Sequence, residues 1–192
     1  EQEKYRNFKV GIAGLSVGSS IIQSLVLTGG PKTIKLADFD TLEVSNLNRI
    51  NASLLDIGES KTDTIAKWIY ERDPFADLHI FEKGVSKEMI EKFILGEPKL
   101  DLFIDEMDDI YMKLYAREIC RKNRIPVLMA GDNGDAGLID VERYDLEPNL
   151  PLLHGLVGDA KAEDFAHVKG GSPEWKKIVA QIFEPQNFTL RH

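Results

Sequence analysis

Cysteine is almost absent from this sequence of 192 residues, and long apolar runs are missing. The one cysteine, Cys120, excludes an internal disulfide and a multi-thiolate site, so no structural zinc is expected. No apolar run approaches the roughly 20 residues of a membrane span, and no signal-peptide pattern opens the chain. Positive charge is also scarce: 24 Lys and Arg face 32 Asp and Glu, and the net charge of −8 argues against a nucleic-acid surface.

The composition that remains is that of an ordinary globular domain. Apolar residues make up 43% and charged residues 29%, which argues against general disorder. At about 150 residues per domain, the length favours one domain with an appendage. Because the sequence begins with Glu1 rather than methionine, we expect a segment of a longer or processed protein. The composition favours a soluble protein of the cytoplasm, with no membrane or nucleic-acid partner.

Short apolar segments alternate with longer amphipathic ones along most of the chain. Strands are predicted at 8–13, 33–37, 77–81, 100–104, 125–130 and 138–144, and helices at 17–28, 60–72, 86–95, 110–122 and 172–183. This alternation predicts an α/β fold that is Rossmann-like and doubly wound, with a mostly parallel sheet and helices on both faces. We expect residues 1–145 to form the domain. Residues 146–192 are expected to form an irregular C-terminal extension with one helix, which packs on the domain or links it to another.

Residues 14–18, Gly-Leu-Ser-Val-Gly, join the first predicted strand to the first predicted helix. Backbone N–H groups and the helix dipole at such a junction favour an anion. The dinucleotide fingerprint G-x-G-x-x-G fits poorly, because Ser16 takes the place of the middle glycine and the turn is one residue shorter. G-x-S-x-G is also the nucleophile elbow of serine hydrolases, but too few residues precede Ser16 for that fold. A tight turn that lets helix pack on strand is the third interpretation.

Four polar features follow predicted strands, at the edge where doubly wound sheets bind ligands. They are Asp38, the run from Asp38-Phe39-Asp40 to Ser45-Asn46-Leu47-Asn48-Arg49, Lys61, and the acids Asp105 and Asp108. Each alone is typical of a turn, a cap or a solvated charge. Together they supply a phosphate contact, a ribose acceptor, two cations and a carboxylate for Mg²⁺, as a nucleoside triphosphate requires. We therefore expect Asp38, Arg49, Lys61 and Asp108 to converge.

The residues around these features resemble one family. The motifs G-L-S-V-G-S, L-A-D-F-D-T-L-E-V-S-N-L-N-R, G-E-S-K and D-E-M-D are similar to those of the ThiF/MoeB/HesA family, adenylating domains related to ubiquitin-activating enzymes. The resemblance covers roughly residues 8–142. The blocks V-E-R-Y-D-L-E-P and H-G-L-V-G-D resemble a subgroup joined to a nitroreductase-like domain.

The resemblance implies a role for each residue that matches a family motif. Backbone groups of Gly14, Ser16 and Gly18 would line the nucleotide, and Asp38 would bind the ribose, with Asp40 supporting the loop or sharing that duty. Asn46 and Arg49 would reach the triphosphate, Lys61 would contact phosphate, and Asp108 would hold Mg²⁺. The implied catalytic set is Arg49, Lys61 and Asp108, with ATP and Mg²⁺ as cofactors.

The resemblance also implies a reaction and a partner. Members of the family adenylate a carboxylate with ATP and Mg²⁺, which gives an acyl-adenylate. The carboxylate is the C-terminus of a ubiquitin-like sulfur carrier, a peptide or a small acid. Relatives are generally homodimers, so the resemblance implies a homodimer here as well.

Three departures from the family pattern keep alternatives open. The glycine turn is short and carries Ser16. The sequence has neither C-x-x-C pairs nor a later acceptor cysteine, and Cys120 is expected to be a packed thiol in a helix. Arg6 is the one arginine before the first predicted strand. The alternatives are a non-catalytic platform for nucleotide binding or dimerisation beside an adjoining domain, and an NAD- or FAD-binding oxidoreductase domain. None of the four histidines is assigned a catalytic role.

Overall fold

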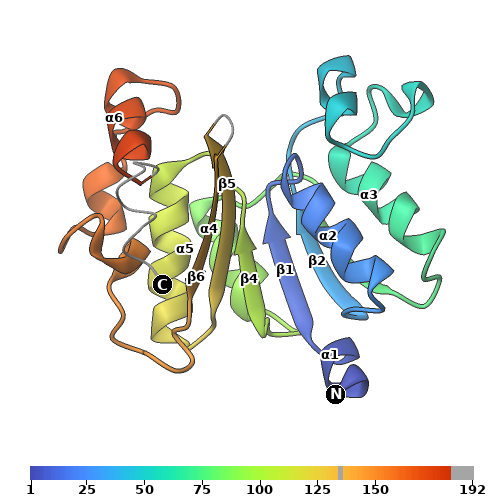
Figure 1. Cartoon of the computed structure of the whole chain (residues 1–192), viewed down its shortest axis with the longest axis horizontal. Helices are drawn as coiled ribbons and strands as arrows, with labels where there is room; N and C mark the ends of the chain where they lie inside the picture. The colour runs from blue at the N-terminus through green and yellow to red at the C-terminus, as the bar shows by residue number, and fades with distance from the viewer. Residues whose placement is uncertain (134–135, 183–192) are drawn as a thin grey trace. The chain divides into compact units, whose positions relative to one another are not determined.

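The computed structural model describes residues 1–133 and 136–182 and divides the chain into two compact units (Figure 1). The first unit ends at Glu106 and the second begins at Met107. The predicted division of the chain between residues 145 and 146 stays a prediction. Within the described ranges, no helix has the length and apolar character needed to cross a bilayer.

The first unit is built on four parallel strands in the order β3-β2-β1-β4. Strands and helices alternate as the sequence predicts, and the short first helix α1 is an addition to that prediction. The strands are β1 (Lys9–Ala13), β2 (Thr33–Ala37), β3 (Asp77–Phe81) and β4 (Leu102–Asp105), and the helices are α1 (Gln2–Arg6), α2 (Gly18–Leu27), α3 (Lys61–Tyr70) and α4 (Lys87–Leu95).

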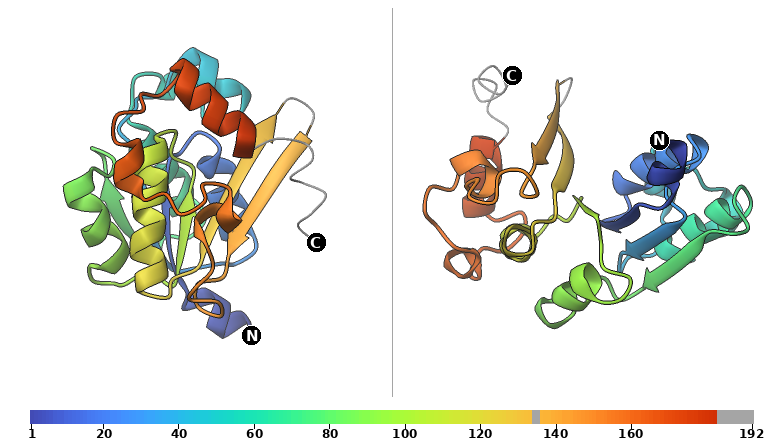
Figure 2. Two further views of the ribbon diagram at one scale, coloured as in Figure 1. Left: turned by 90° about the vertical axis from the view of Figure 1, so that its left-hand side faces the viewer. Right: turned by 90° about the horizontal axis from the view of Figure 1, so that it is seen from below.

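Helices cover both faces of this sheet. Successive residues of a strand point to opposite faces, and the neighbours Gly11 and Ile12 of β1 illustrate this. A Cβ atom on Gly11 would lie 2.9 Å from the Phe93 ring of α4, whereas one on Gly18 of α2 would lie 2.9 Å from Ile12. Figure 2 shows α2 and α3 on one face and α4 on the other. The prediction of an α/β, doubly wound fold is confirmed.

A buried lysine ties α4 to the sheet. Lys35 lies in β2 with 2% of its surface exposed, and its Nζ donates to the carbonyl oxygens of Phe93 and Gly96, each at 2.8 Å. These carbonyls belong to the C-terminal end of α4, where the helix dipole favours a cation. Burial lowers the pKa of the Lys35 ammonium below its ordinary value, and the nearby Glu97 opposes that shift.

The second unit contains α5 (Ile110–Lys122), the antiparallel pair β5 (Val127–Asn133) and β6 (Ala136–Glu142), and α6 (Pro173–Ile182). Cross-strand pairing continues to Asn133 and Ala136, beyond the strand ends predicted at residues 130 and 138. Residues 134–135, and Phe183 at the end of the last predicted helix, lie outside the described residues. Two 3₁₀ helices, η3 (Leu152–Gly155) and η4 (Ala162–Phe165), interrupt the predicted loops of the extension.

One buried ion pair organises the interior of the second unit. Arg117 of α5 is fully buried, and its Nε donates to Glu142 at the end of β6. The Tyr144 hydroxyl and the Leu153 backbone N–H both donate to the other oxygen of that carboxylate. Burial, reinforced by Glu142, raises the pKa of Tyr144 far above its ordinary value. The cluster therefore joins a helix, a strand and η3 through one carboxylate.

Candidate functional site

The glycine turn follows β1 and requires a glycine at its first position. Gly14 has φ +94°, and a Cβ atom there would lie 2.2 Å from the carbonyl oxygen of Glu106. Its N–H donates to the carbonyl oxygen of Ala37 at 2.9 Å. The turn is thus held against the carboxyl ends of β2 and β4, as expected for a ligand site in a doubly wound sheet.

The N-terminus of α2 is open to a ligand. Val17 occupies the N-cap position, and no side chain caps the helix there. The Ser19 hydroxyl donates to the carbonyl oxygen of Ser16 at 2.8 Å, which stabilises the turn without using the first N–H groups of α2. Because such N–H groups and the helix dipole attract anions, this end of a ten-residue helix suits a phosphate.

Asp38 joins the glycine turn to the segment after β2. Its Oδ2 accepts from the Leu15 N–H at 2.7 Å, and its Oδ1 accepts from the Asp40 N–H at 2.8 Å. The residue is 9% exposed. Each carboxylate oxygen carries two lone pairs, so both can still accept from a ligand hydroxyl. Asp38 therefore shapes the site in addition to the ribose contact that the resemblance implies.

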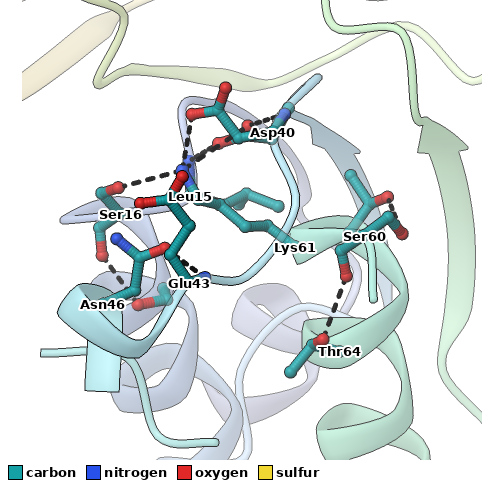
Figure 3. A network of polar contacts seen from close by, with 11 residues as sticks. Leu15, Ser16, Asp40, Glu43, Asn46, Ser60, Lys61 and Thr64 are labelled. Atoms are coloured by element: carbon teal, nitrogen blue, oxygen red, sulfur yellow. Dashed lines mark hydrogen bonds and ion pairs between the residues drawn. The ribbon is translucent and has the colours of Figure 1, made fainter. Parts of the chain in front are cut away.

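Lys61 brings three segments of the first unit together (Figure 3). It begins α3, where Ser60 is the N-cap residue and accepts from the Asp63 N–H at 3.0 Å. The Lys61 ammonium lies 2.7 Å from the Asp40 carboxylate, 3.9 Å from that of Asp38 and 3.3 Å from the Ser16 hydroxyl. The Lys61 side chain is 5% exposed, but that of Asp40 is 51% exposed. The Lys61 ammonium is thus buried, whereas the Asp40 carboxylate that pairs with it is exposed to solvent.

The segment 41–60 leaves the sheet and returns to it. Thr41 and Ser60 pair across its base, and the Lys61 N–H donates to the carbonyl oxygen of Asp40 at 3.0 Å. It contains two 3₁₀ helices, η1 (Val44–Asn48) and η2 (Leu54–Asp56), each with a capping box. The signal for these caps, a polar residue three positions after another, is present in the sequence.

Asn46 and Arg49 both hold η1 in place. The buried Asn46 accepts from the Glu43 N–H through Oδ1 at 3.0 Å, so its amide nitrogen is the atom that could donate to a phosphate. The Arg49 guanidinium donates to the carbonyl oxygen of Ser45 at 3.2 Å and to Asn48 Oδ1 at 2.9 Å. Its side chain is exposed, and these two acceptors belong to its own turn.

Asp108 belongs to the second unit and directly precedes the N-cap residue of α5. It is exposed, and its backbone carbonyl accepts from the Trp175 indole at 3.0 Å. The next residue, Asp109, is the N-cap of α5 and accepts from the Met112 N–H at 3.0 Å. Asp105 is fully buried, so Asp108 is the better placed of the two predicted acids to meet a ligand.

A single exposed carboxylate suits magnesium that arrives with a nucleotide. In residues 1–133 and 136–182, no group of three or more His, Cys, Asp or Glu could hold a metal ion. Mg²⁺ is usually bound through one or two carboxylates, substrate phosphates and water. The donor set around Asp108 therefore fits a nucleotide-bound ion rather than a metal site built from protein ligands alone.

The first unit brings together six of the predicted residues: Gly14, Ser16, Gly18, Asp38, Asp40 and Lys61. Asn46 lies in η1, Arg49 is the C-cap residue of η1, and Asp108 lies in the other unit. Arg6 pairs with Asp73 at 2.8 Å. Sequence reasoning missed a contact between His154 Nε2 and Oδ1 of the buried Asp140, which lie 2.8 Å apart. No local signal marks that pair, because a loop separates its members in the sequence.

Comparison with known proteins supports the sequence resemblance. The sequence model of the ThiF family matches residues 1–154. The uncharacterized protein MT1398 of Mycobacterium tuberculosis is 41% identical over 163 residues, which are 85% of this chain and 22% of that protein. The chain thus spans about a fifth of that relative.

Two solved structures from E. coli share the fold. The tRNA N6-threonylcarbamoyladenosine dehydratase TcdA, solved in complex with AMP, has a TM-score of 0.64 at 24% identity, covering 70% of this chain and 56% of its own. MccB, solved with AMPCPP and MccA, has a TM-score of 0.63 at 24% identity, covering 72% and 40%. The family match extends over most of the sequence and includes every predicted site residue. The chain belongs to the ThiF family.

Proposed function

We propose that this domain binds ATP with Mg²⁺ and transfers the adenylyl group to a carboxylate, which gives an acyl-adenylate and pyrophosphate. The observation that carries the proposal is the cluster of Lys61, Asp38 and Asp40 beside the uncapped N-terminus of α2. Membership of the ThiF family and the adenine nucleotides bound in TcdA and MccB support it. An NAD- or FAD-dependent oxidoreductase has no comparable support.

The chain's own residues would bind and orient the nucleotide. Gly14, Ser16 and Gly18 let the backbone approach the phosphates, and Asp38 accepts from the ribose hydroxyls while it holds the turn. Lys61 and Arg49 supply positive charge, Lys61 as a point charge and Arg49 as a planar fork. To reach a phosphate, Arg49 must exchange its contacts with Ser45 and Asn48 for the ligand.

No covalent intermediate on the protein is needed. An oxygen of the substrate carboxylate attacks the α-phosphorus of ATP, a new P–O bond forms, and the bond to the pyrophosphate oxygen breaks with its electron pair. The task of the protein is to align the reactants and to stabilise charge on the phosphates. Cys120 is fully buried in α5, which places its thiol away from solvent and argues against an acyl transfer to it.

The family resemblance gives further proposed roles to Asp108 and to Asn46 of η1. Asp108 would hold Mg²⁺, which neutralises charge on the phosphates when it is bound. The Asn46 amide nitrogen would donate to a phosphate oxygen while Oδ1 keeps its contact with Glu43.

The proposed substrate is the carboxylate of a peptide, of a ubiquitin-like protein or of a small acid. MccB was solved with MccA, whereas the name of TcdA refers to tRNA. The net charge of −8 favours a protein or a small molecule over tRNA for this chain. We further propose that the chain forms a homodimer, as the family resemblance implies. We also propose that it belongs to the subgroup joined to a nitroreductase-like domain, as the motifs V-E-R-Y-D-L-E-P and H-G-L-V-G-D imply.

Exchange of labelled pyrophosphate into ATP tests the reaction. We expect carboxylate-dependent exchange by the wild-type protein, and at least a hundredfold loss in Asp108→Ala and Arg49→Ala, as for a lost transition-state contact. Candidate carboxylates are supplied one at a time, and AMP release is measured in parallel. Exchange undiminished by both substitutions would contradict the assigned residues.

The alternative is a platform that binds nucleotide without turnover. It is favoured by one observation: the Arg49 guanidinium is held by its own turn and the Lys61 ammonium by two carboxylates. Calorimetry with ATP, with and without Mg²⁺, separates the two functions. Binding without pyrophosphate exchange or AMP release for any carboxylate supports the platform.

A further inference from the structure

The segment that follows the family match packs along α5. The ThiF model ends at residue 154, and η4 lies beyond it. The Ala162 N–H donates to the Glu118 carboxylate at 2.9 Å, and the Tyr111 hydroxyl donates to Glu163 at 3.2 Å. The extension is therefore anchored both in the first turn of α5 and further along that helix.

The next helix of the extension reaches the residue before the N-cap of α5. Trp175 lies in the first turn of α6, and its backbone N–H donates to the Ser172 hydroxyl at 3.1 Å. Its indole Nε1 donates to the carbonyl oxygen of Asp108 at 3.0 Å. Figure 1 shows α6 near the N-terminal end of α5.

These contacts fix the backbone of Asp108 on both sides without using its carboxylate. On one side the Trp175 indole binds its carbonyl, and on the other Asp109 caps α5 through the Met112 N–H. The carbonyl precedes the helix and has no place in the α5 ladder, so the indole supplies the donor it needs. The exposed carboxylate stays available for a ligand.

We propose that the extension, through Trp175, positions the Asp108 carboxylate to hold the magnesium ion of the proposed reaction. This inference rests on the proposed function. Trp175 is a positioning residue, because it touches the backbone of Asp108 and neither substrate nor metal. Loss of the indole N–H releases the carbonyl, and the carboxylate then samples a wider range of positions before it can bind the ion.

The test variant is Trp175→Phe, which removes the indole N–H and keeps an aromatic ring. The matched control is Tyr111→Phe, which removes the hydrogen bond from Tyr111 to Glu163 of the extension and leaves the Asp108 carbonyl bound. Binding of a non-hydrolysable ATP analogue is measured by calorimetry with and without Mg²⁺. Hydrogen exchange at the backbone amides of residues 109–112 and the urea midpoint are measured on the same proteins.

In Trp175→Phe, we expect the Mg²⁺ concentration for half-maximal enhancement of nucleotide binding to rise about three- to tenfold, the effect of one lost hydrogen bond. Binding without Mg²⁺ stays unchanged, exchange at residues 109–112 becomes faster, and Tyr111→Phe keeps the wild-type Mg²⁺ dependence.

Two results overturn the positioning role. One is an unchanged Mg²⁺ dependence in Trp175→Phe. The other is an equal loss of nucleotide binding with and without Mg²⁺, which would show that Trp175 stabilises the fold in general rather than the position of Asp108. In both cases the proposed function survives if Asp108→Ala still abolishes the Mg²⁺ effect. If the wild-type protein binds no nucleotide, the proposed function and the positioning role both fail.

Discussion

Two clusters in this chain pair a buried cation with a carboxylate, and they differ in what remains open. In the second unit, Arg117 and Glu142 have side chains 0% and 1% exposed, and Tyr144 and Leu153 donate to the same carboxylate. In the first unit, the Lys61 side chain is also buried, with 5% of its surface exposed, but the side chain of its partner Asp40 is 51% exposed. This first cluster, made of Lys61, Asp38 and Asp40, lies beside the N-terminus of α2, which has no side-chain cap.

This difference separates a structural ion pair from a candidate binding site. A buried carboxylate surrounded by donors holds elements together and offers nothing to a ligand. A buried ammonium behind an exposed carboxylate can exchange that partner for a phosphate without leaving its place. The comparison predicts that substitutions in the first cluster reduce activity, whereas substitutions in the second reduce stability.

The largest effect is expected from Arg117→Met. The substitution leaves Glu142 buried without its cation, which should reduce the free energy of unfolding by about 3–5 kcal/mol. Urea unfolding followed by circular dichroism measures the change. The control is Arg143→Met, because Arg143 pairs with Asp145 at the surface and should contribute less than about 1 kcal/mol. Equal losses in the two variants would show that burial does not distinguish these pairs.

Lys61→Ala should have the next largest effect, on activity. Loss of one charge contact with the phosphates should slow adenylation about 10²–10³-fold, or about 2.7–4 kcal/mol in the transition state. Pyrophosphate exchange measures the rate. Lys67→Ala is the matched control, since Lys67 lies on the same helix, is largely exposed and pairs with Asp56. An active Lys61→Ala variant would place the first cluster with the structural pairs.

The smallest effect concerns Lys35, a third buried cation whose acceptors are helix carbonyls. Its pKa in the folded chain lies below the ordinary 10.5, because burial disfavours the ammonium. Between the folded and the unfolded pKa the unfolded chain binds more protons, so stability should rise with pH across that window. At pH values below the pKa of Lys35 in the folded chain, Lys35 is protonated in both states, and this gain in stability is absent.

Urea unfolding at about pH 8 and about pH 10.5, for the wild type and Lys35→Met, measures this contribution as a difference between the two proteins. We expect the wild type to gain stability relative to Lys35→Met as the pH rises. A difference that stays constant with pH would contradict the lowered pKa.

Much of the fold could be predicted, because its signals are local. Apolar periodicity located the strands and the longer helices of the described residues, and Gly29, with φ +72°, follows the C-cap of α2 next to the helix end predicted at residue 28. The 3₁₀ helices were missed, since they depend on short capping boxes rather than on an apolar pattern. Lys35 was also missed: a lysine inside an apolar strand is unusual, but its acceptors lie about sixty residues further along the chain.

The candidate site could be predicted in part. The motifs identified Asp38, Asp40 and Lys61, whose side chains the first unit brings together. They could not show that both oxygens of Asp38 already bind backbone N–H groups, or that Arg49 is held by its own turn. Hydrogen-bond partners depend on the path of the backbone around each residue, which a motif does not describe.

The sequence by itself determined the order of the elements, the family and the residues that could carry the chemistry. These properties depend on residue types and short spacings, whose effects extend over only a few neighbouring positions. The tertiary structure decided which charges are buried, which carboxylates stay open and that Trp175 binds the backbone of Asp108. Those features arise where segments distant in the sequence pack together, because burial and pairing depend on all the neighbours in space at once.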